Sequence, residues 1–394
     1  MKDPSGVWCN SGQWHRHRKR GVADYDLVIR GGTVVDPAEV VHVPGDVAIK
    51  DGKIASIGVP LADCTARRVL DASGQYVVPG LVDLHVHVFP GASKFGIDAD
   101  RHCLQRGVTT VLDAGTAGAT NWPAFEDQVA SKATRVLALL NISVIGMPAD
   151  GELLDVAWID PDRAARAITA HRDRIVGVKV RLSPKVVGEN AERAFSAAIE
   201  ASETVGLPLM VHANASSLPM HDILNRLRPG DIVTHCFNTS AHSVLDPNGL
   251  LRREALEARR RGVLFDVGHG MGSFSFQVAE RAMQQGFLPD TISSDLHALN
   301  VDGLVRDLPH VLSKFLVLGM SLDEVLVRAT QRPAEILTPR AGLGTLRPGT
   351  AADVVLLTLD EGEFEFHDSL DATRTGQRRL LPTTTVRAGQ VVTP

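Results

Sequence analysis

Two histidines separated by one residue are the pair in this sequence best suited to chemistry. His85 and His87 stand at the end of an apolar run that begins at Val77. Because side chains on a strand alternate between faces, both imidazoles point the same way, about 6–7 Å apart along the backbone. Two such groups at one rigid strand end make half of a metal site. The two residues could also be ordinary histidines near a strand terminus. A metal site is therefore predicted only if the sequence offers further ligands.

Four more ionisable residues stand at or near the ends of separate strand-like apolar runs. These residues are Lys179, His212, His235 and Asp295. Buried strands are otherwise rich in Val, Leu and Ile, so packing alone does not explain an ionisable residue at four strand ends. Each side chain would rise onto the same face as the histidine pair. The six residues together therefore predict a metal site.

The apolar runs belong to a regular alternation of strands and helices. Strand-like runs are expected at 81–86, 108–113, 136–140, 175–180, 208–212, 232–235, 262–267 and 291–295, with helical patterns such as 191–204, 250–260, 275–285 and 322–336 between them. Eight β-α repeats over roughly 250 residues match an α/β fold of the (β/α)8 TIM-barrel type, whose active site lies at the C-terminal ends of the strands. We expect residues 81–341 to form this barrel.

Both ends of the chain carry strand patterns of a different kind. Residues 26–30 and 33–36 flank Gly31-Gly32, and residues 46–49 and 54–57 flank Asp51-Gly52, so that each pair predicts a hairpin. Segments 354–357 and 384–392 are also strand-like. A small sheet made from one end alone would leave edges unpaired. We therefore expect residues 24–80 and 342–394 to form one discontinuous β-sandwich from both chain ends.

Composition excludes several classes of protein. The 394 residues carry a net charge of −5, which gives no basic field for nucleic acid. The four cysteines form no C-x-x-C pair and indicate reduced thiols of a cytoplasmic protein. The sequence contains no run of about 18 apolar residues, so no membrane span is predicted. Residues 1–23 include a basic cluster at 15–20, which is expected to belong to a disordered leader, with a nucleic-acid or membrane tether as the alternative.

These residues resemble the amidohydrolase superfamily, specifically its members with two metals and a carboxylated lysine. The resemblance covers almost the whole chain and rests on segments 79–87, 177–179, 211–212, 234–235 and 294–295. It implies that His85, His87 and Asp295 hold one metal. It implies that His212 and His235 hold the other, with Lys179 bridging the two as a carbamate. Zinc suits such ligands, and manganese, iron or cobalt would also fit.

The resemblance also implies a mechanism and a class of substrate. A water between two dications loses a proton near neutral pH, and Asp295 is the catalytic residue that would take and pass on protons. Loop segments 113–119, 178–183, 235–238 and 268–276 resemble the deacetylase-like branch, often labelled dihydroorotase-like. Its members hydrolyse acyl esters or amides of small carboxylates, such as O-acyl 2-hydroxy acids and N-acyl amino acids.

Two residues are candidates for substrate binding. Arg181 lies two residues beyond Lys179, so its guanidinium could grip a substrate carboxylate. The alternative for Arg181 is a salt bridge to a barrel residue such as Asp113. Asp113 and Asp266 also end strands, and either could cap the helix that follows. His269 could hydrogen-bond the carbonyl or the leaving group, or it could be a rim residue held by glycines. Cys236 is expected to pack in the core.

Alternative functions remain open at this stage. True dihydroorotases carry an arginine two residues after the second histidine of the pair, where this chain has Phe89. Dihydroorotate cyclisation is therefore disfavoured, and opening of a cyclic imide or hydantoin is the second enzymatic interpretation. A non-catalytic scaffold is the third, although all six ligand positions are filled. Association into a homo-oligomer is also open, since related barrels often associate.

Overall fold

The computed structural model describes residues 23–61, 63–148, 150–337 and 342–392. Apart from residue 23, the predicted leader lies outside the described residues. None of the helices in these ranges is both long and apolar enough to cross a lipid bilayer.

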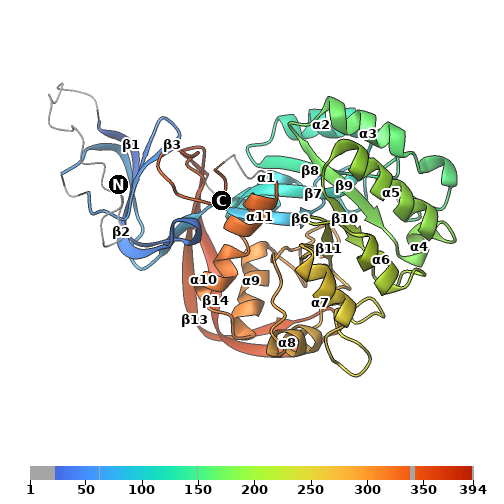
Figure 1. Cartoon of the computed structure of the whole chain (residues 1–394). Coiled ribbons are helices and arrows are strands. Elements are labelled where there is room, and N and C mark those ends of the chain that lie inside the picture. Colours follow the sequence, from blue (N-terminus) through green and yellow to red (C-terminus); the bar gives the residue numbers. More distant parts are fainter. Residues whose placement is uncertain (1–22, 62, 149, 338–341, 393–394) are drawn as a thin grey trace.

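Seven parallel strands of the described chain form the barrel sheet, each next to its sequence neighbour (Figure 1). They are β6 (Leu81–Val86), β7 (Val108–Gly118), β8 (Arg135–Asn141), β9 (Ile175–Arg181), β10 (Leu209–His212), β11 (Ile232–Thr234) and β12 (Leu264–Phe265). Residues 291–296 close the barrel, because Thr291 bridges Asp266 beyond β12 and Leu296 bridges Val86 in β6. The (β/α)8 prediction is confirmed, with an eighth strand reduced to isolated bridges.

Helices cover the outside of the barrel (Figure 1). They are α1 (Ala99–His102), α2 (Trp122–Ala130), α3 (Pro161–Ala170), α4 (Pro184–Val187), α5 (Ala191–Val205), α6 (Met220–Arg226), α7 (Arg253–Arg260), α8 (Phe276–Gln284), α9 (Leu308–Val317), α10 (Leu322–Val327) and α11 (Gln331–Leu337). In α5 the buried positions Ala194, Ala198, Ala201 and Val205 recur every three or four residues, which places them on one face against the barrel. The helix ends at Gly206, whose φ is +65°.

The strands of both chain ends pair in one eight-stranded sheet. Its order is β15 (Gln390–Val392), β14 (Thr373–Arg387), β13 (Val354–His367), β5 (Tyr76–Pro79), β1 (Tyr25–Asp36), β2 (Val41–Lys50) and β3 (Lys53–Ile57), with β4 (Ala66–Asp71) beside β1. The association of the two chain ends agrees with the sequence, while the boundaries at residues 80 and 342 stay a prediction. Alternate residues face opposite sides, so that Val77 packs in the sheet's own core and Val78 packs in the barrel core.

One of the two predicted hairpins is wrong. Gly31-Gly32 lies inside the continuous strand β1, at a register shift between Ile29 and Gly32 that indicates a bulge. The glycines are required there, because Gly31 has a φ of +74° and a Cβ on Gly32 would collide with Val77. The hairpin at Asp51-Gly52 is confirmed: it joins β2 to β3, and its two residues have φ values of +51° and +70°.

The long hairpin of β13 and β14 connects the sheet to the barrel (Figure 1). In β14, Leu380 donates its backbone N–H to Ser313 Oγ in α9 at 2.9 Å. At the hairpin tip, Asp368 Oδ2 accepts from the backbone N–H of Phe276 at the start of α8 at 2.8 Å. The hairpin tip therefore lies beside the loop that follows β12.

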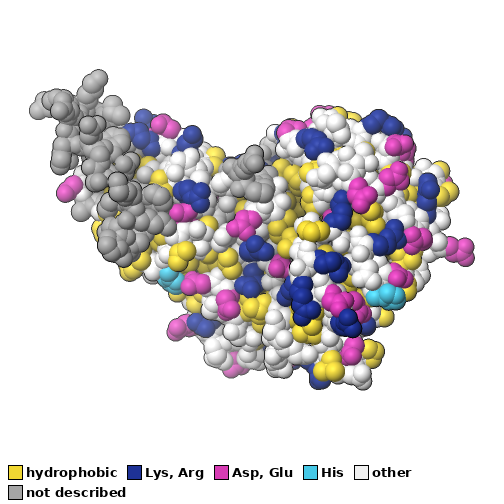
Figure 2. Space-filling model, viewed as in Figure 1, with side chains coloured by type: hydrophobic (Ala, Val, Ile, Leu, Met, Phe, Trp, Pro, Cys, Tyr) yellow, Lys and Arg dark blue, Asp and Glu magenta, His cyan; other side chains and the backbone are white. Residues whose placement is uncertain are grey.

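The visible surface carries both signs of charge. On the face drawn in Figure 2, Lys and Arg side chains alternate with Asp and Glu over the barrel helices. Arg226 of α6 pairs with Glu192 of α5 at 2.8 Å. This mixed surface agrees with the small net charge of −5.

Candidate metal centre

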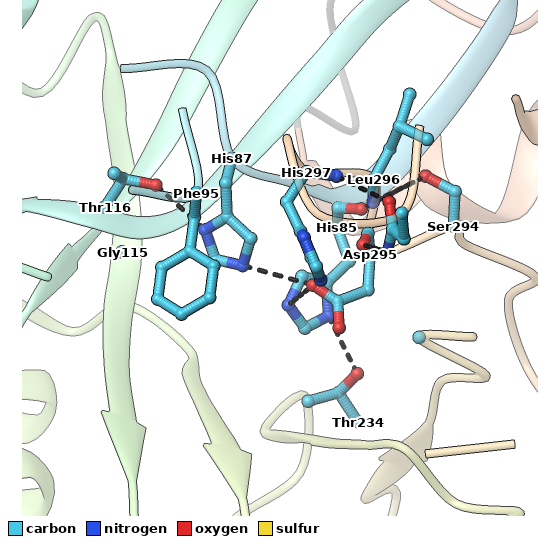
Figure 3. Close-up of polar contacts among 12 residues, drawn as sticks. His85, His87, Phe95, Gly115, Thr116, Thr234, Ser294, Asp295, Leu296 and His297 are labelled. Atoms are coloured by element: carbon cyan, nitrogen blue, oxygen red, sulfur yellow. Dashed lines mark hydrogen bonds and ion pairs between the residues drawn. The ribbon is translucent and has the colours of Figure 1, made fainter. Parts of the chain in front are cut away.

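The ends of the barrel strands bring all six predicted metal ligands together. His85 Nε2 lies 3.4 Å and His87 Nε2 lies 3.1 Å from Asp295 Oδ1 (Figure 3). Lys179 Nζ lies 3.2 Å from His85 Nε2. The ring of His235 is 5.1 Å from that of His85 and 4.4 Å from that of His212. All six belong to one cluster at the C-terminal ends of the strands.

A hydrogen-bonded relay fixes the tautomer of His85. The hydroxyl of Thr234 donates to Asp266 Oδ2 at 2.8 Å, and Thr234 Oγ1 lies 2.9 Å from His85 Nδ1. Because the hydroxyl proton is already committed, the oxygen can only accept from the imidazole. His85 Nδ1 therefore carries the ring proton, and the lone pair of Nε2 faces the cluster.

His87 is held in the same way by a different threonine. Its Nδ1 lies 2.8 Å from Thr116 Oγ1, whose hydroxyl is hydrogen-bonded to Asp113. Asp113 also accepts from the backbone N–H groups of Thr116 at 2.7 Å and Val88 at 2.8 Å. Asp113 and Asp266 thus serve histidine relays, and the prediction that they could cap helices is wrong.

Hydrogen bonds also orient the remaining two histidines. His235 is oriented by a carbonyl: its Nδ1 lies 2.6 Å from that of Gly268, which can only accept, so this nitrogen is protonated. His212 is oriented by a hydroxyl that is itself bonded to a carbonyl: its Nε2 lies 3.0 Å from Ser183 Oγ, which donates to the Asn214 carbonyl at 3.0 Å. His212 therefore donates from Nε2 and keeps its lone pair on Nδ1.

The electrostatics of the cluster favour a cation. Burial lowers the pKa of His87 to about 3 and that of His235 to about 4, and it holds the pKa values of His85 and His212 well below the ordinary range. The imidazoles are therefore neutral near pH 7, and their contacts with Asp295 are not ion pairs. Nitrogen lone pairs and a carboxylate oxygen that face each other within 3.1–3.4 Å repel one another unless a cation lies among them. This donor set fits a divalent metal.

Lys179 is fully enclosed in the cluster. Its side chain is 1% exposed, and burial lowers its pKa to about 7. Much of this lysine is therefore the neutral amine at neutral pH, which has a lone pair that an ammonium lacks. Gly115 makes room for it, because a Cβ there would collide with the Lys179 stem.

The backbone is strained at two of the candidate ligands. His235 has a φ of +63° and Asp295 has a φ of +50°, a region that non-glycine residues rarely adopt. The carboxylate of buried Asp83 accepts from Ser294 Oγ at 2.5 Å and from its backbone N–H at 3.0 Å, which fixes the residue before Asp295. Burial raises the pKa of Asp83 to about 7. Asp83 was not predicted from the sequence as a supporting residue, although it stands two positions before His85.

The two candidate substrate residues lie in different surroundings. Arg181 donates from Nε and Nη2 to the two carboxylate oxygens of buried Glu152, each at 2.7 Å, so its partner is Glu152 and not Asp113. His269 is not at the rim: it is 0% exposed, and its ring nitrogens contact the Gly270 carbonyl and Lys314 Nζ. Both ring nitrogens of His269 are hydrogen-bonded inside the protein, so neither is placed to bind a substrate.

One further prediction and one unpredicted residue complete the description of the site. Cys236 packs in the barrel core, as expected. His297, which the sequence analysis missed, accepts from the backbone N–H of Leu299 at Nδ1, at 3.2 Å, so its Nε2 carries the proton. Its ring lies 6.2 Å from that of His87 and 5.4 Å from that of Phe95 (Figure 3). Its position two residues after Asp295 was the signal that could have found it.

Comparisons with known proteins agree with this geometry. A model of the Amidohydrolase family matches residues 76–250. A protein of Enterococcus faecalis named deacetylase is 35% identical over 373 residues, which cover 93% of this chain and 99% of that protein. A crystal structure of an adenine deaminase has a TM-score of 0.88 at 34% identity, covering 94% of this chain and 100% of that one. A dihydroorotase structure has a TM-score of 0.84 at 30% identity, covering 93% and 99%. The chain therefore belongs to the amidohydrolase family and is a hydrolase.

Proposed function

We propose that this hydrolase cleaves the acyl ester or amide bond of a small substrate that bears a carboxylate. The observation that carries the proposal is the cluster of four neutral histidines with Asp295 and Lys179, in which Nε2 of His85 and Nε2 of His87 face the Asp295 carboxylate. The name of the Enterococcus faecalis relative, deacetylase, supports removal of a small acyl group.

The residues present suit two divalent ions, with zinc the ion we propose. His85, His87 and Asp295 would hold one ion, and His212 and His235 would hold the other. When bound, the ions would polarise the scissile carbonyl and lower the pKa of water. We assign Asp295 the proton transfer, because its carboxylate lies at the cluster and its side chain is 13% exposed, against 1% for His85 and 8% for His87.

Lys179 would join the two sites as a carbamate. The neutral amine attacks CO2, a C–N bond forms, and one proton leaves for solvent. The product is an anionic group with two oxygen ligands. A buried lysine whose pKa lies near 7 supplies the neutral amine that this reaction requires.

Arg181 and His297 would bind the substrate carboxylate. Two guanidinium nitrogens of Arg181 contact Glu152, so Nη1 is the nitrogen we assign to the substrate. Phe95 lies between the two residues, with its ring centroid 5.6 Å from the Arg181 guanidinium carbon and 5.4 Å from the His297 ring. These side chains would form a wall with an apolar centre and two hydrogen-bond donors.

Phe89 weighs against dihydroorotate as the substrate. Its ring is buried and lies 5.2 Å from that of Phe125, so it belongs to the core and offers no donor to a carboxylate. Opening of a cyclic imide or hydantoin stays the second candidate, because the same cluster of metal ligands would serve a cyclic amide bond.

A substrate screen on the metal-loaded enzyme tests the proposal. N-acyl amino acids, O-acyl 2-hydroxy acids and cyclic imides would be compared at equal concentration, with release of the acid as the readout. We expect turnover of acylated carboxylates and much slower turnover of their methyl esters. Preference for the cyclic imides would favour the second candidate. No hydrolysis of any class by fully loaded enzyme would contradict the proposal.

A further inference from the structure

A buried lysine outside the metal centre joins three separate segments. The side chain of Lys314 in α9 is 0% exposed. Its Nζ donates to His269 Nε2 at 2.9 Å, to the Leu304 carbonyl at 3.0 Å and to the His367 carbonyl at 2.7 Å. These acceptors belong to the loop after β12, the loop before α9 and the last residue of β13. Three acceptors match the three protons of the charged ammonium, and they favour that form even though burial lowers the pKa of Lys314 to about 7.

The first of these acceptors is a rigidly held imidazole. His269 donates from Nδ1 to the Gly270 carbonyl at 2.9 Å, so Nε2 carries the lone pair that accepts from Lys314. Its ring stacks on Phe274 with centroids 4.5 Å apart and planes at 27°. Hydrogen bonds at both nitrogens and a stacked face fix the position of this side chain.

The backbone on both sides of His269 presses against the metal centre. The carbonyl of Gly268 accepts from His235 Nδ1 at 2.6 Å and so sets its tautomer. A Cβ on Gly268 would collide with His235 Nδ1, and a Cβ on Gly270 would collide with Asp295 Oδ2. The loop therefore contacts two candidate ligands through its backbone. Ser293 and Ser294 hold that backbone by accepting from the N–H groups of residues 268–270, and the His269 side chain adds a further anchor.

The hairpin from the chain-end sheet holds the other end of the same loop. At its tip, Ser369 donates its backbone N–H to the Phe274 carbonyl at 3.0 Å, and Asp368 Oδ2 accepts from the backbone N–H of Phe276. Lys314 adds the bond to the His367 carbonyl at the end of β13. Residues 268–276 are thus fixed at one end by Lys314 and at the other by the hairpin tip.

We propose that Lys314 is a positioning residue for the metal centre, which acts through His269 to hold Gly268 and Gly270 against His235 and Asp295. The inference rests on the metal-dependent function proposed above. A buried lysine is costly to desolvate, and a methionine would fill a similar volume. The lysine contributes what an apolar side chain does not, namely simultaneous bonds to the loop, to the segment before α9 and to the hairpin.

Cobalt binding to the K314M variant tests this role. Metal-free protein would be titrated with Co²⁺ against a competing chelator while the visible absorption of the bound ion is recorded. S313A is the matched control, because Ser313 is the adjacent buried residue of α9 and bonds to Leu380 without touching His269. We expect K314M to bind the second Co²⁺ about tenfold more weakly and with an altered absorption spectrum, because the loop that holds the His235 and Asp295 side chains loses an anchor. S313A should bind both ions as the wild type does.

Kinetics and a second variant complete the test. K314M should lower kcat while KM stays within about twofold, since the substrate wall is untouched. H269F keeps the stack on Phe274 but removes the acceptor for Lys314, and it should weaken the second Co²⁺ like K314M. The double variant should be no worse than either single variant, because both changes break the same connection.

Each result supports or overturns the inference. Wild-type Co²⁺ binding by K314M, or equal weakening by K314M and S313A, would overturn it. If K314M does not fold, H269F decides: weakened binding supports the inference and wild-type binding overturns it. A wild-type protein that binds fewer than two Co²⁺ and hydrolyses nothing would instead overturn the proposed function, and this inference with it.

Discussion

At the scale of single residues, the candidate metal centre depends on proton positions as much as on the ligand side chains themselves. Thr234 and Thr116 each pass a hydrogen bond from a histidine to a buried carboxylate, which directs a lone pair into the cluster. The sequence predicted the six candidate ligands, because an ionisable residue at the end of an apolar strand is conspicuous. It did not predict Thr234 or Thr116, because a threonine in a strand is ordinary and its partner is distant in sequence.

Removing one relay hydroxyl should weaken metal binding. In T234V, His85 loses the acceptor for Nδ1, and its ring is free to adopt the wrong tautomer. We expect metal affinity to fall by about 10–100-fold, measured by competition with a chelator. T291V is the matched control, because Thr291 also donates to Asp266, at 2.7 Å, but does not contact His85. Equal losses in both variants would show that only Asp266 matters.

Replacing the proposed proton carrier should separate catalysis from metal binding. D295N keeps an oxygen ligand but cannot take up a proton. We expect kcat to fall by about 10²–10⁴-fold while most of the metal stays bound, as measured by steady-state kinetics and elemental analysis on one preparation. A near-normal kcat would refute the proton-transfer role.

At the scale of elements, the sequence pattern predicted the barrel strands and the presence of strands at both chain ends, but not the full length of the chain-end strands. The runs at 81–86 and 175–180 were found because apolar residues dominate them, as is typical of parallel strands buried on both faces. β13 extends to His367, far beyond the predicted 354–357, because its distal half includes exposed charged residues that pair with β14. Gly31-Gly32 suggested a turn, whereas the fold uses these glycines for a bulge and close packing.

The packing of α9 on β13 should make stability depend on pH. Burial lowers the pKa of His310, whose ring lies 5.2 Å from that of Phe366, to about 3. Below its unfolded pKa of about 6.5 the unfolded chain binds a proton that the folded chain excludes, so this contribution to stability is lost as pH falls from 6.5 towards 3. The free energy of unfolding of the wild type relative to H310F should fall by at most about 1.4 kcal/mol per pH unit.

Urea unfolding at pH 7.5 and pH 5.5 measures this difference. The wild type should lose more stability than H310F between the two values. Parallel loss in the two proteins would contradict the assignment of a neutral, buried His310.

At the scale of the whole molecule, the chain-end sheet and the barrel form one frame around the site. Asp353 at the start of β13 accepts from Arg135 of β8 at 2.7 Å and from Arg387 of β14 at 3.0 Å. Lys314 and the hairpin tip add the second connection, beside the metal centre. The sequence predicted that the two chain ends meet. It did not predict that the β13–β14 hairpin reaches the loop after β12, because this contact joins residues as distant in sequence as Phe276 and Asp368.

Loss of the Asp353 connection should destabilise the fold without changing substrate affinity. D353N removes the negative charge that two partly buried arginines share, and we expect a loss of about 2–3 kcal/mol in unfolding free energy. D360N is the control, because Asp360 meets Arg379 at 3.6 Å on the exposed part of the same sheet and should cost less than about 1 kcal/mol. A D353N protein as stable as D360N would contradict this connection.

Metal content and activity of the purified enzyme, measured before and after chelation, test whether the histidine cluster is a catalytic metal centre. We predict two divalent ions per chain, loss of hydrolysis when they are removed, and recovery when they are returned. Less than one ion per chain, together with hydrolysis that survives the chelator, would contradict it.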